Sequence, residues 1–149
     1  MKRILTALTV ATLAFGASPA FADAAKDYYG KQKVVYHINY DDPKQQMGAM
    51  RNVQNHINAV GADNLDLKVV MHGNGLSLLK RANEDPDFEG RVANLKNQNI
   101  QFKVCANTLK GRKIDYKADL YDVSDGDIVP SGVAEIAHLQ AQGYTYLKP

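Results

Sequence analysis

The sequence contains very little cysteine and no tryptophan. Its 149 residues include one Cys and no Trp, and the formal net charge is only +2. A single Cys excludes an internal disulfide and any zinc or iron–sulfur site built on several cysteines. The small, evenly spread charge does not favour nucleic acid or an anionic membrane as a partner. A hydrophobic fraction of 45% instead indicates a globular chain of one domain.

Long apolar runs are also absent, except at the start of the chain. Lys2 and Arg3 precede an uncharged apolar stretch over residues 4–15, and residues 20–22 (AFA) have the small-x-small pattern of a signal-peptidase site. The run is too short to span a bilayer comfortably, which favours a cleaved signal peptide over a membrane anchor. We therefore expect a signal peptide over residues 1–22. The short basic start without an Arg-Arg pair predicts export to the bacterial periplasm.

Removal of this segment makes the remaining chain formally neutral. The segment holds two of the 18 basic residues and none of the 16 acidic ones, so about 127 residues remain with 16 of each sign. Nothing after residue 22 is apolar enough to cross a membrane. We expect a soluble mature protein, with a polar lead-in over 23–32 and a folded domain over 33–149.

Beyond residue 32, short segments rich in β-branched and aromatic residues alternate with segments of helical period. Strands are predicted over residues 33–39, 65–72, 100–105, 127–129 and 144–147. Helices are predicted over residues 43–60, 76–82, 85–96, 106–111 and 130–142, the last with Val133, Ile136 and Ala137 facing inward. This alternation predicts an α/β fold, a three-layer α/β/α sandwich with a mainly parallel sheet of about five strands.

Two Asp-Pro pairs mark predicted helix starts. Asp42 precedes Pro43, and Asp85 precedes Pro86. An Asp side chain can cap a helix, and Pro suits its first turn. The acidic residues at these points therefore indicate helix caps rather than catalytic pairs.

The carboxyl ends of the predicted strands carry the candidate site, because ligands of open parallel sheets bind beyond those ends. His37 lies near the end of the first strand and His72 at the end of the second. Cys105 ends the third strand. Two of the four His residues and the only Cys are therefore expected near one edge of the sheet.

Cys105 is the sharpest candidate for chemistry. A thiol between a strand and a helix lies near unpaired backbone N–H groups, which together with the helix dipole favour the nucleophilic thiolate. Lys110, Arg112 and Lys113 follow closely and add positive charge. Such a thiolate can attack sulfur or another electrophile, or carry a persulfide. The alternative is a buried, inert Cys105, because free Cys is among the most buried residue types.

Residues around Cys105 suggest further roles. His72 could orient or deprotonate the thiol, or simply hydrogen-bond to backbone at the strand end. The turn of Gly73, Asn74 and Gly75, together with Asn107, could offer N–H groups to an anionic ligand, although it lacks the phosphate-loop and dinucleotide patterns. A tight strand-to-helix turn is the alternative. We expect no cofactor, and no metal at His37, His72 and Cys105, because their spacing matches no known motif.

Three segments resemble the DsrE/DsrF-like superfamily: KVVMHGNGLSLL, IQFKVCANTLKGR and VPSGVAEIAHLQAQGYTYLKP. The resemblance covers residues 33–149, and LQxQGYxYxKP is its most specific piece. It implies a three-layer α/β/α domain that often assembles as trimers or hexamers. It also implies a role for Cys105, whose position matches the Cys through which the best understood members accept and pass on persulfide sulfur.

Two functions therefore remain open. The first is a periplasmic sulfur (persulfide) carrier or sulfurtransferase-like protein that uses Cys105 and works with a sulfur donor or acceptor protein. The second is a non-catalytic oligomeric module for binding or assembly, with a structural Cys105. In both we expect a homo-oligomer, a trimer or hexamer, which is consistent with aromatic residues such as Tyr144 and Tyr146 in the last strand.

Overall fold

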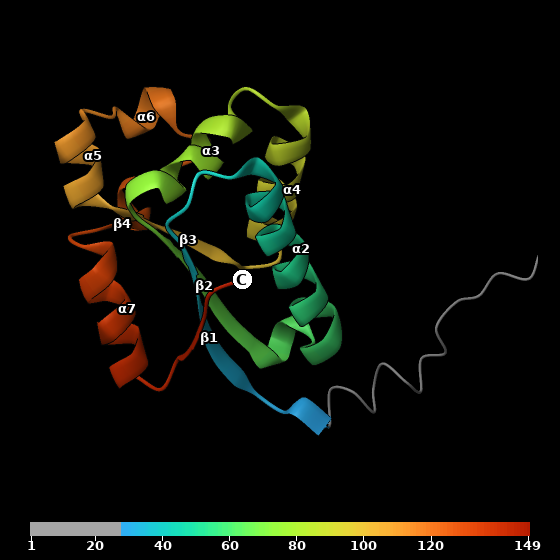
Figure 1. The fold of residues 1–149 in the computed structure, drawn as a ribbon. Helices are drawn as coiled ribbons and strands as arrows, with labels where there is room; N and C mark the ends of the chain where they lie inside the picture. Colours follow the sequence, from blue (N-terminus) through green and yellow to red (C-terminus); the bar gives the residue numbers. More distant parts are fainter. Residues whose placement is uncertain (1–27) are drawn as a thin grey trace, which may run out of the picture.

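The computed structural model describes residues 28–149, which form a parallel sheet flanked by helices (Figure 1). The expected signal peptide over 1–22 and residues 23–27 of the lead-in lie outside the described residues. The strands are β1 (Gln32–Ile38), β2 (Leu65–Met71), β3 (Gln101–Cys105), β4 (Ile128–Val129) and β5 (Thr145–Leu147). The α-helices are α2 (Pro43–Val60), α3 (Ser77–Ala82), α4 (Pro86–Asn97), α5 (Ala106–Arg112), α6 (Tyr116–Asp119) and α7 (Gly132–Ala141). Short 3₁₀ helices span Ala62–Asn64, Gly73–Leu76 and Asp125–Asp127.

The sheet has the strand order β4-β3-β2-β1-β5, and every pair of neighbouring strands is parallel. Parallel neighbours require connections that cross a face of the sheet. Helices α2, α3 and α4 lie on one face, and α7 lies on the other (Figure 1). The predicted three-layer α/β/α architecture is confirmed. Within residues 28–149, no helix is both long and apolar enough to span a bilayer.

The two faces of the sheet are covered unequally. The face toward α2, α3 and α4 holds the larger core, which includes Phe102 of β3 and Met50 of α2. The core beneath α7 is small and consists of Val35, Val70, Ile136, Leu139 and Tyr144. Of the described helices, α7 alone therefore covers this face of the sheet, whereas α2, α3 and α4 pack on the opposite face.

Helix α7 contacts the sheet along a narrow strip, which corrects one prediction. Ile136 is buried as expected, whereas Val133 is 64% exposed and Ala137 is exposed. The expected inward orientation of Val133 and Ala137 is wrong. A helix packed alone on a sheet buries only its central row, and its flanks face solvent.

The predicted helix caps are present. The Asp42 carboxylate accepts a hydrogen bond from the Gln45 backbone N–H at 2.6 Å, and Asp85 accepts one from the Asp87 N–H at 2.9 Å. Gly61 caps the end of α2, and its φ of 86° lies in the region that favours glycine. Helix α6 was not predicted, because a single turn is too short to show a helical period.

Gly75 packs directly against the end of β1. It is buried, and a Cβ added at this position would overlap the carbonyl oxygen of Ile38. The missing side chain thus lets the turn after β2 lie against the backbone of the neighbouring strand. This contact fixes the turn that carries His72 and Asn74.

We predict that Gly75→Ala lowers the free energy of unfolding by about 1–3 kcal/mol, because the added methyl group forces the two backbones apart. Equilibrium urea unfolding measures the change. Gly90→Ala in α4 is the matched control, because a Cβ there meets nothing within 4 Å. It should stabilise the protein by about 0.4–1 kcal/mol through lower entropy of the unfolded chain. Equal stability of the Gly75 variant and the wild type would contradict the packing described above.

Candidate functional site

Four chemically active side chains form a row across adjacent strands at the carboxyl edge of the sheet. Tyr146 lies on β5, His37 on β1, His72 directly after β2, and Cys105 at the end of β3. Side chains alternate between faces along a strand, so His37 lies on the same face as Val35, which packs beneath α7. Tyr146 pairs in register with Val35. The predicted gathering of His37, His72 and Cys105 at one edge is confirmed.

Hydrogen bonds connect three members of this row. His37 Nδ1 lies 2.7 Å from the Tyr146 hydroxyl, and His37 Nε2 lies 2.7 Å from His72 Nε2. Burial, followed by the positive charges of His72 and Lys148, lowers the pKa of His37 to about 4. Burial and then Lys148 also lower the pKa of His72. Both imidazoles are therefore neutral at neutral pH, and one proton lies between the two Nε2 atoms.

Cys105 is buried, with only 4% of the residue exposed. Burial raises the pKa of the thiol, but hydrogen bonds outweigh this effect and leave the pKa below its ordinary value. The donors are the Thr108 hydroxyl and the backbone N–H groups of Gly132, Thr108 and Asn107. These N–H groups belong to the first turns of α5 and α7, where no partner exists within the helix. The hydrogen bonds thus favour the thiolate.

The Thr108 hydroxyl links the sulfur to the turn after β2. Its oxygen accepts a hydrogen bond from the Gly73 N–H at 2.9 Å. Because the oxygen already accepts there, its own proton is free to point at Cys105. Gly73 therefore orients the donor that stabilises the thiolate, although its N–H does not reach the sulfur itself.

Gly132 separates His72 from Cys105. A Cβ at this position would lie 3.0 Å from His72 Cβ and 3.3 Å from Cys105 Cβ. A larger residue would therefore push against both side chains. Among the described residues, no hydrogen bond joins His72 to Cys105, and the Nε2 atom of His72 faces His37 instead. The structure brings the two predicted residues to one corner without a direct bond.

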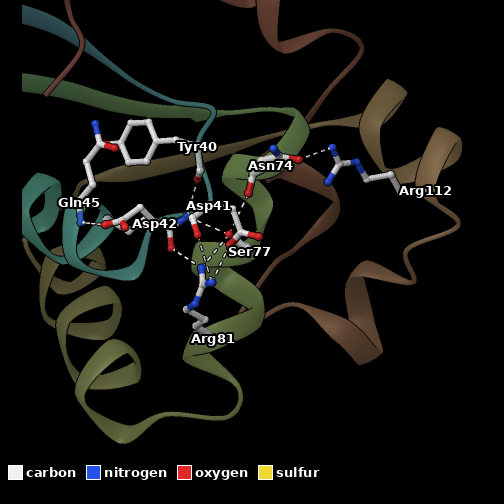
Figure 2. Close-up of polar contacts among 9 residues, drawn as sticks. Tyr40, Asp41, Asp42, Gln45, Asn74, Ser77, Arg81 and Arg112 are labelled. Atoms are coloured by element: carbon white, nitrogen blue, oxygen red, sulfur yellow. Dashed lines mark hydrogen bonds and ion pairs between the residues drawn. The ribbon is translucent and has the colours of Figure 1, made fainter.

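The other predicted residues of the turn have distinct surroundings. The side-chain oxygen of Asn74 accepts a hydrogen bond from Arg112 at 2.7 Å (Figure 2). Gly75 is buried against β1, and Asn107 offers its N–H to Cys105. Asn107 is thus the member of the predicted ligand-binding set whose backbone reaches the sulfur.

A second polar network, centred on Arg81, holds the loop between β1 and α2 (Figure 2). Arg81 forms an ion pair with Asp41 at 2.6 Å and donates to Gln46 Oε1 at 2.8 Å and to Ser77 Oγ at 2.9 Å. Gln46 is fully buried, and its amide donates to the Tyr40 carbonyl. Hydrogen bonds from Ser77 and Arg81 lower the pKa of Asp41. The network ties α2 to α3, and no sequence motif predicted it.

A cleft of about 390 Å³ opens beside this network. Leu76 and Leu120 contribute apolar surface, and Lys80, Arg112 and Lys113 contribute positive charge. Within residues 28–149, no group of three or more His, Cys, Asp or Glu side chains could hold a metal ion. Asp41 and Asp119 also line the cleft, so groups of both charges face it.

Sequence reasoning did not assign Thr108, Gly132 or Tyr146 to the site. Thr108 lies three residues after Cys105, in the first turn of the helix that follows. That spacing is the sequence signal that could have indicated a contact between the two side chains. Gly132 and Tyr146 come from elements far along the chain. Nothing local in the sequence indicated that they reach Cys105 and His37.

Comparison with known proteins now places this fold. Residues 33–149 match the family model of the DsrE/DsrF-like family. The chain belongs to the DsrE/DsrF-like family. A solved structure of a protein of unknown function, MTH1491 from Methanobacterium thermoautotrophicum, is similar to this DsrE-like chain with 33% identity and a TM-score of 0.65. The match covers 80% of this chain and 100% of that one. No curated protein matches the sequence.

Family membership confirms the resemblance carried by the three sequence segments. It supports a role in sulfur relay for this DsrE-like protein. The solved structure, whose function is unknown, adds agreement in fold over the whole of its own length.

We predict that Thr108→Val raises the pKa of the Cys105 thiol, because the variant loses the hydroxyl that donates to the sulfur. The thiolate then forms at higher pH, and less of it is present at neutral pH. The ultraviolet absorbance of the thiolate, followed against pH with Cys105→Ser as the blank, measures the shift. Thr145→Val, on β5 away from the sulfur, should leave the titration unchanged. An unaltered midpoint in the Thr108 variant would show that the hydroxyl does not stabilise the thiolate.

Proposed function

We propose that this DsrE-like protein is a sulfur carrier of the bacterial periplasm, in which Cys105 accepts and passes on sulfur as a persulfide. The observation that carries the proposal is the arrangement around the buried thiol, where the Thr108 hydroxyl and three backbone N–H groups donate to the sulfur and lower its pKa. Family membership supports the sulfur-relay role. The export segment expected over residues 1–22 supports the location.

The transfer needs no oxidant or cofactor. The Cys105 thiolate attacks the outer sulfur of a donor persulfide, R–S–SH. The S–S bond of the donor breaks while a new S–S bond forms to Cys105, and R–S⁻ leaves with the electron pair. The product is a Cys105 persulfide. The N–H groups of Asn107 and Gly132, which stabilise the thiolate, then lie beside the product sulfur.

The chain has one Cys, so it holds no second thiol to release the sulfur. A thiol of another molecule must attack the Cys105 persulfide to complete the transfer. The proposal therefore includes a sulfur donor and a sulfur acceptor protein as partners. Both must reach a sulfur that is almost fully buried in the monomer.

Incubation of the protein with an organic persulfide should increase its intact mass by one sulfur atom. Cys105→Ser should gain nothing, because no other thiol is present. Treatment of the loaded protein with a small thiol should return the original mass. A wild-type Cys105 that resists both persulfide transfer and alkylation in the folded state would rule out the carrier function.

A second candidate is a module for binding or assembly without catalysis, with a structural Cys105. The observation that favours it is the cleft of about 390 Å³ with Lys80, Arg112 and Lys113 at its border. In that case Cys105→Ser should fold, assemble and bind as the wild type does. A binding defect confined to the Cys105 variant, with unchanged stability, would contradict this candidate.

The proposal also includes a homo-oligomer, a trimer or hexamer. Strand β5 is an edge strand, and an unpaired strand edge is a ready site of association. Large hydrophobic side chains are exposed at five described positions: Tyr28, Tyr29, Val133, Tyr146 and Leu147.

Light scattering at micromolar concentration should give the mass of a trimer or hexamer. Leu147→Lys should shift the protein toward smaller species, because it places a charge on the exposed edge strand. Lys148→Ala, next to it, is the control for a change of charge without loss of apolar surface. A monomeric mass of the wild type would disprove the assembly.

A further inference from the structure

The hydrogen-bonded row of Tyr146, His37 and His72 runs from the edge of the sheet to the corner that holds Cys105. Tyr146 on the edge strand is 37% exposed, whereas His37 is only 8% exposed. The two contacts that join the three side chains are each 2.7 Å long. His72 then borders Gly132, which also borders Cys105. The row thus connects a surface phenol to the neighbourhood of the sulfur.

The two imidazoles can arrange their protons in two ways. If the shared proton belongs to His37 Nε2, then His37 Nδ1 accepts from the Tyr146 hydroxyl and His72 carries its proton on Nδ1. If it belongs to His72 Nε2, then His37 Nδ1–H donates to Tyr146 and His72 Nδ1 has a free lone pair. Movement of one proton along the row converts a donor at His72 into an acceptor. Lys148 and burial favour neutral imidazoles, which this exchange requires.

We propose that Tyr146, His37 and His72 form a proton relay that serves sulfur transfer at Cys105. The inference rests on the proposed persulfide chemistry and assigns His72 as the group that exchanges a proton with the substrate. His37 and Tyr146 act through His72 and are positioning residues. In this relay His72 donates a proton to the substrate. The sequence suggested instead that His72 orients the Cys105 thiol or takes a proton from it.

Proton movement along the row accompanies the sulfur transfer. The Cys105 thiolate attacks R–S–SH, and the leaving R–S⁻ receives the proton of His72 Nδ1. His72 Nε2 takes the proton of His37 Nε2, and His37 Nδ1 takes that of the Tyr146 hydroxyl. Solvent then returns a proton to the Tyr146 oxygen at the exposed edge. One S–S bond breaks, one forms, and one proton passes from solvent to the leaving thiol.

The test compares two persulfide donors in single-turnover loading of Cys105, followed by intact mass. An alkyl persulfide releases a basic thiolate that benefits from a proton, whereas an aryl persulfide releases a weakly basic one that leaves without help. Tyr146→Phe and His37→Gln should slow loading from the alkyl donor by at least about tenfold, since a positioned proton donor contributes about 10²–10⁴-fold. Loading from the aryl donor should change little.

Alkylation of Cys105 by iodoacetamide is the control reaction, because the thiolate displaces iodide without any proton transfer. Its rate should be the same in both variants and in the wild type. Tyr144→Phe is the control variant, since the Tyr144 hydroxyl contacts Asp66 and Lys68 instead of the row. It should load like the wild type. His37→Gln tests the proton transfer between His37 and His72. Tyr146 is more exposed than His37, so Tyr146→Phe is less expected to disturb folding.

Each other outcome overturns the relay. Equal loading of wild type and variants from the alkyl donor would show that the row carries no proton. A uniform slowing of both donors and of alkylation would show that the row only shapes the fold around Cys105. If wild-type Cys105 is alkylated but takes sulfur from neither donor, the carrier function itself fails. If instead the wild type loads sulfur at the same rate as the variants, only the relay fails and the carrier function stands.

Discussion

The site depends on parallel strand pairing, which directs the carboxyl ends of neighbouring strands to one edge of the sheet. The pairs are β1 with β2, β1 with β5, and β2 with β3. The helices that follow β3 and β4 then diverge. Leu109 of α5 packs with the larger core, whereas Ile136 of α7 packs on the opposite face. In open parallel sheets, ligands bind at the carboxyl ends of adjacent strands whose connections leave toward opposite faces. Cys105 lies there, and the first turns of both helices reach it.

Two opposing electrostatic effects act on the Cys105 thiol. Burial disfavours the charged form, while hydrogen bonds to a charged group each contribute about 1.5–3 kcal/mol. Several donors converge on Cys105, so the second effect prevails. Burial, together with Lys148, also lowers the pKa values of His37 and His72 and keeps both imidazoles neutral. One corner of the sheet therefore contains a thiol and two imidazoles whose pKa values are all lowered.

Much of this arrangement could be predicted from the sequence. The Asp-Pro pairs at Asp42 and Asp85 set the starts of α2 and α4, because capping depends on neighbours along the chain. The common edge of His37, His72 and Cys105 followed from the alternation of strands and helices, since parallel strands end on the same side. Local patterns were sufficient for these features.

The rest depends on contacts between distant parts of the chain. Gly132 reaches Cys105 only because β4 lies next to β3, and Tyr146 reaches His37 only because β5 lies next to β1. Strand order is a property of the whole fold and has no local signal. Val133 and Ala137 were wrongly placed inward for a related reason. Apolar spacing predicts a buried face, but its width depends on how many helices share the sheet.

The thin layer formed by α7 has a consequence for access to the sulfur. Its core of Val35, Val70, Ile136, Leu139 and Tyr144 is small, and regions with few buried apolar contacts open locally at lower free energy than the rest of a protein. Opening at the start of α7 uncovers Cys105. It also withdraws the Gly132 N–H, which raises the pKa of the thiol, and admits water, which relieves the burial that raises this pKa in the closed state. One local motion therefore makes the sulfur accessible and replaces a protein donor beside it with water.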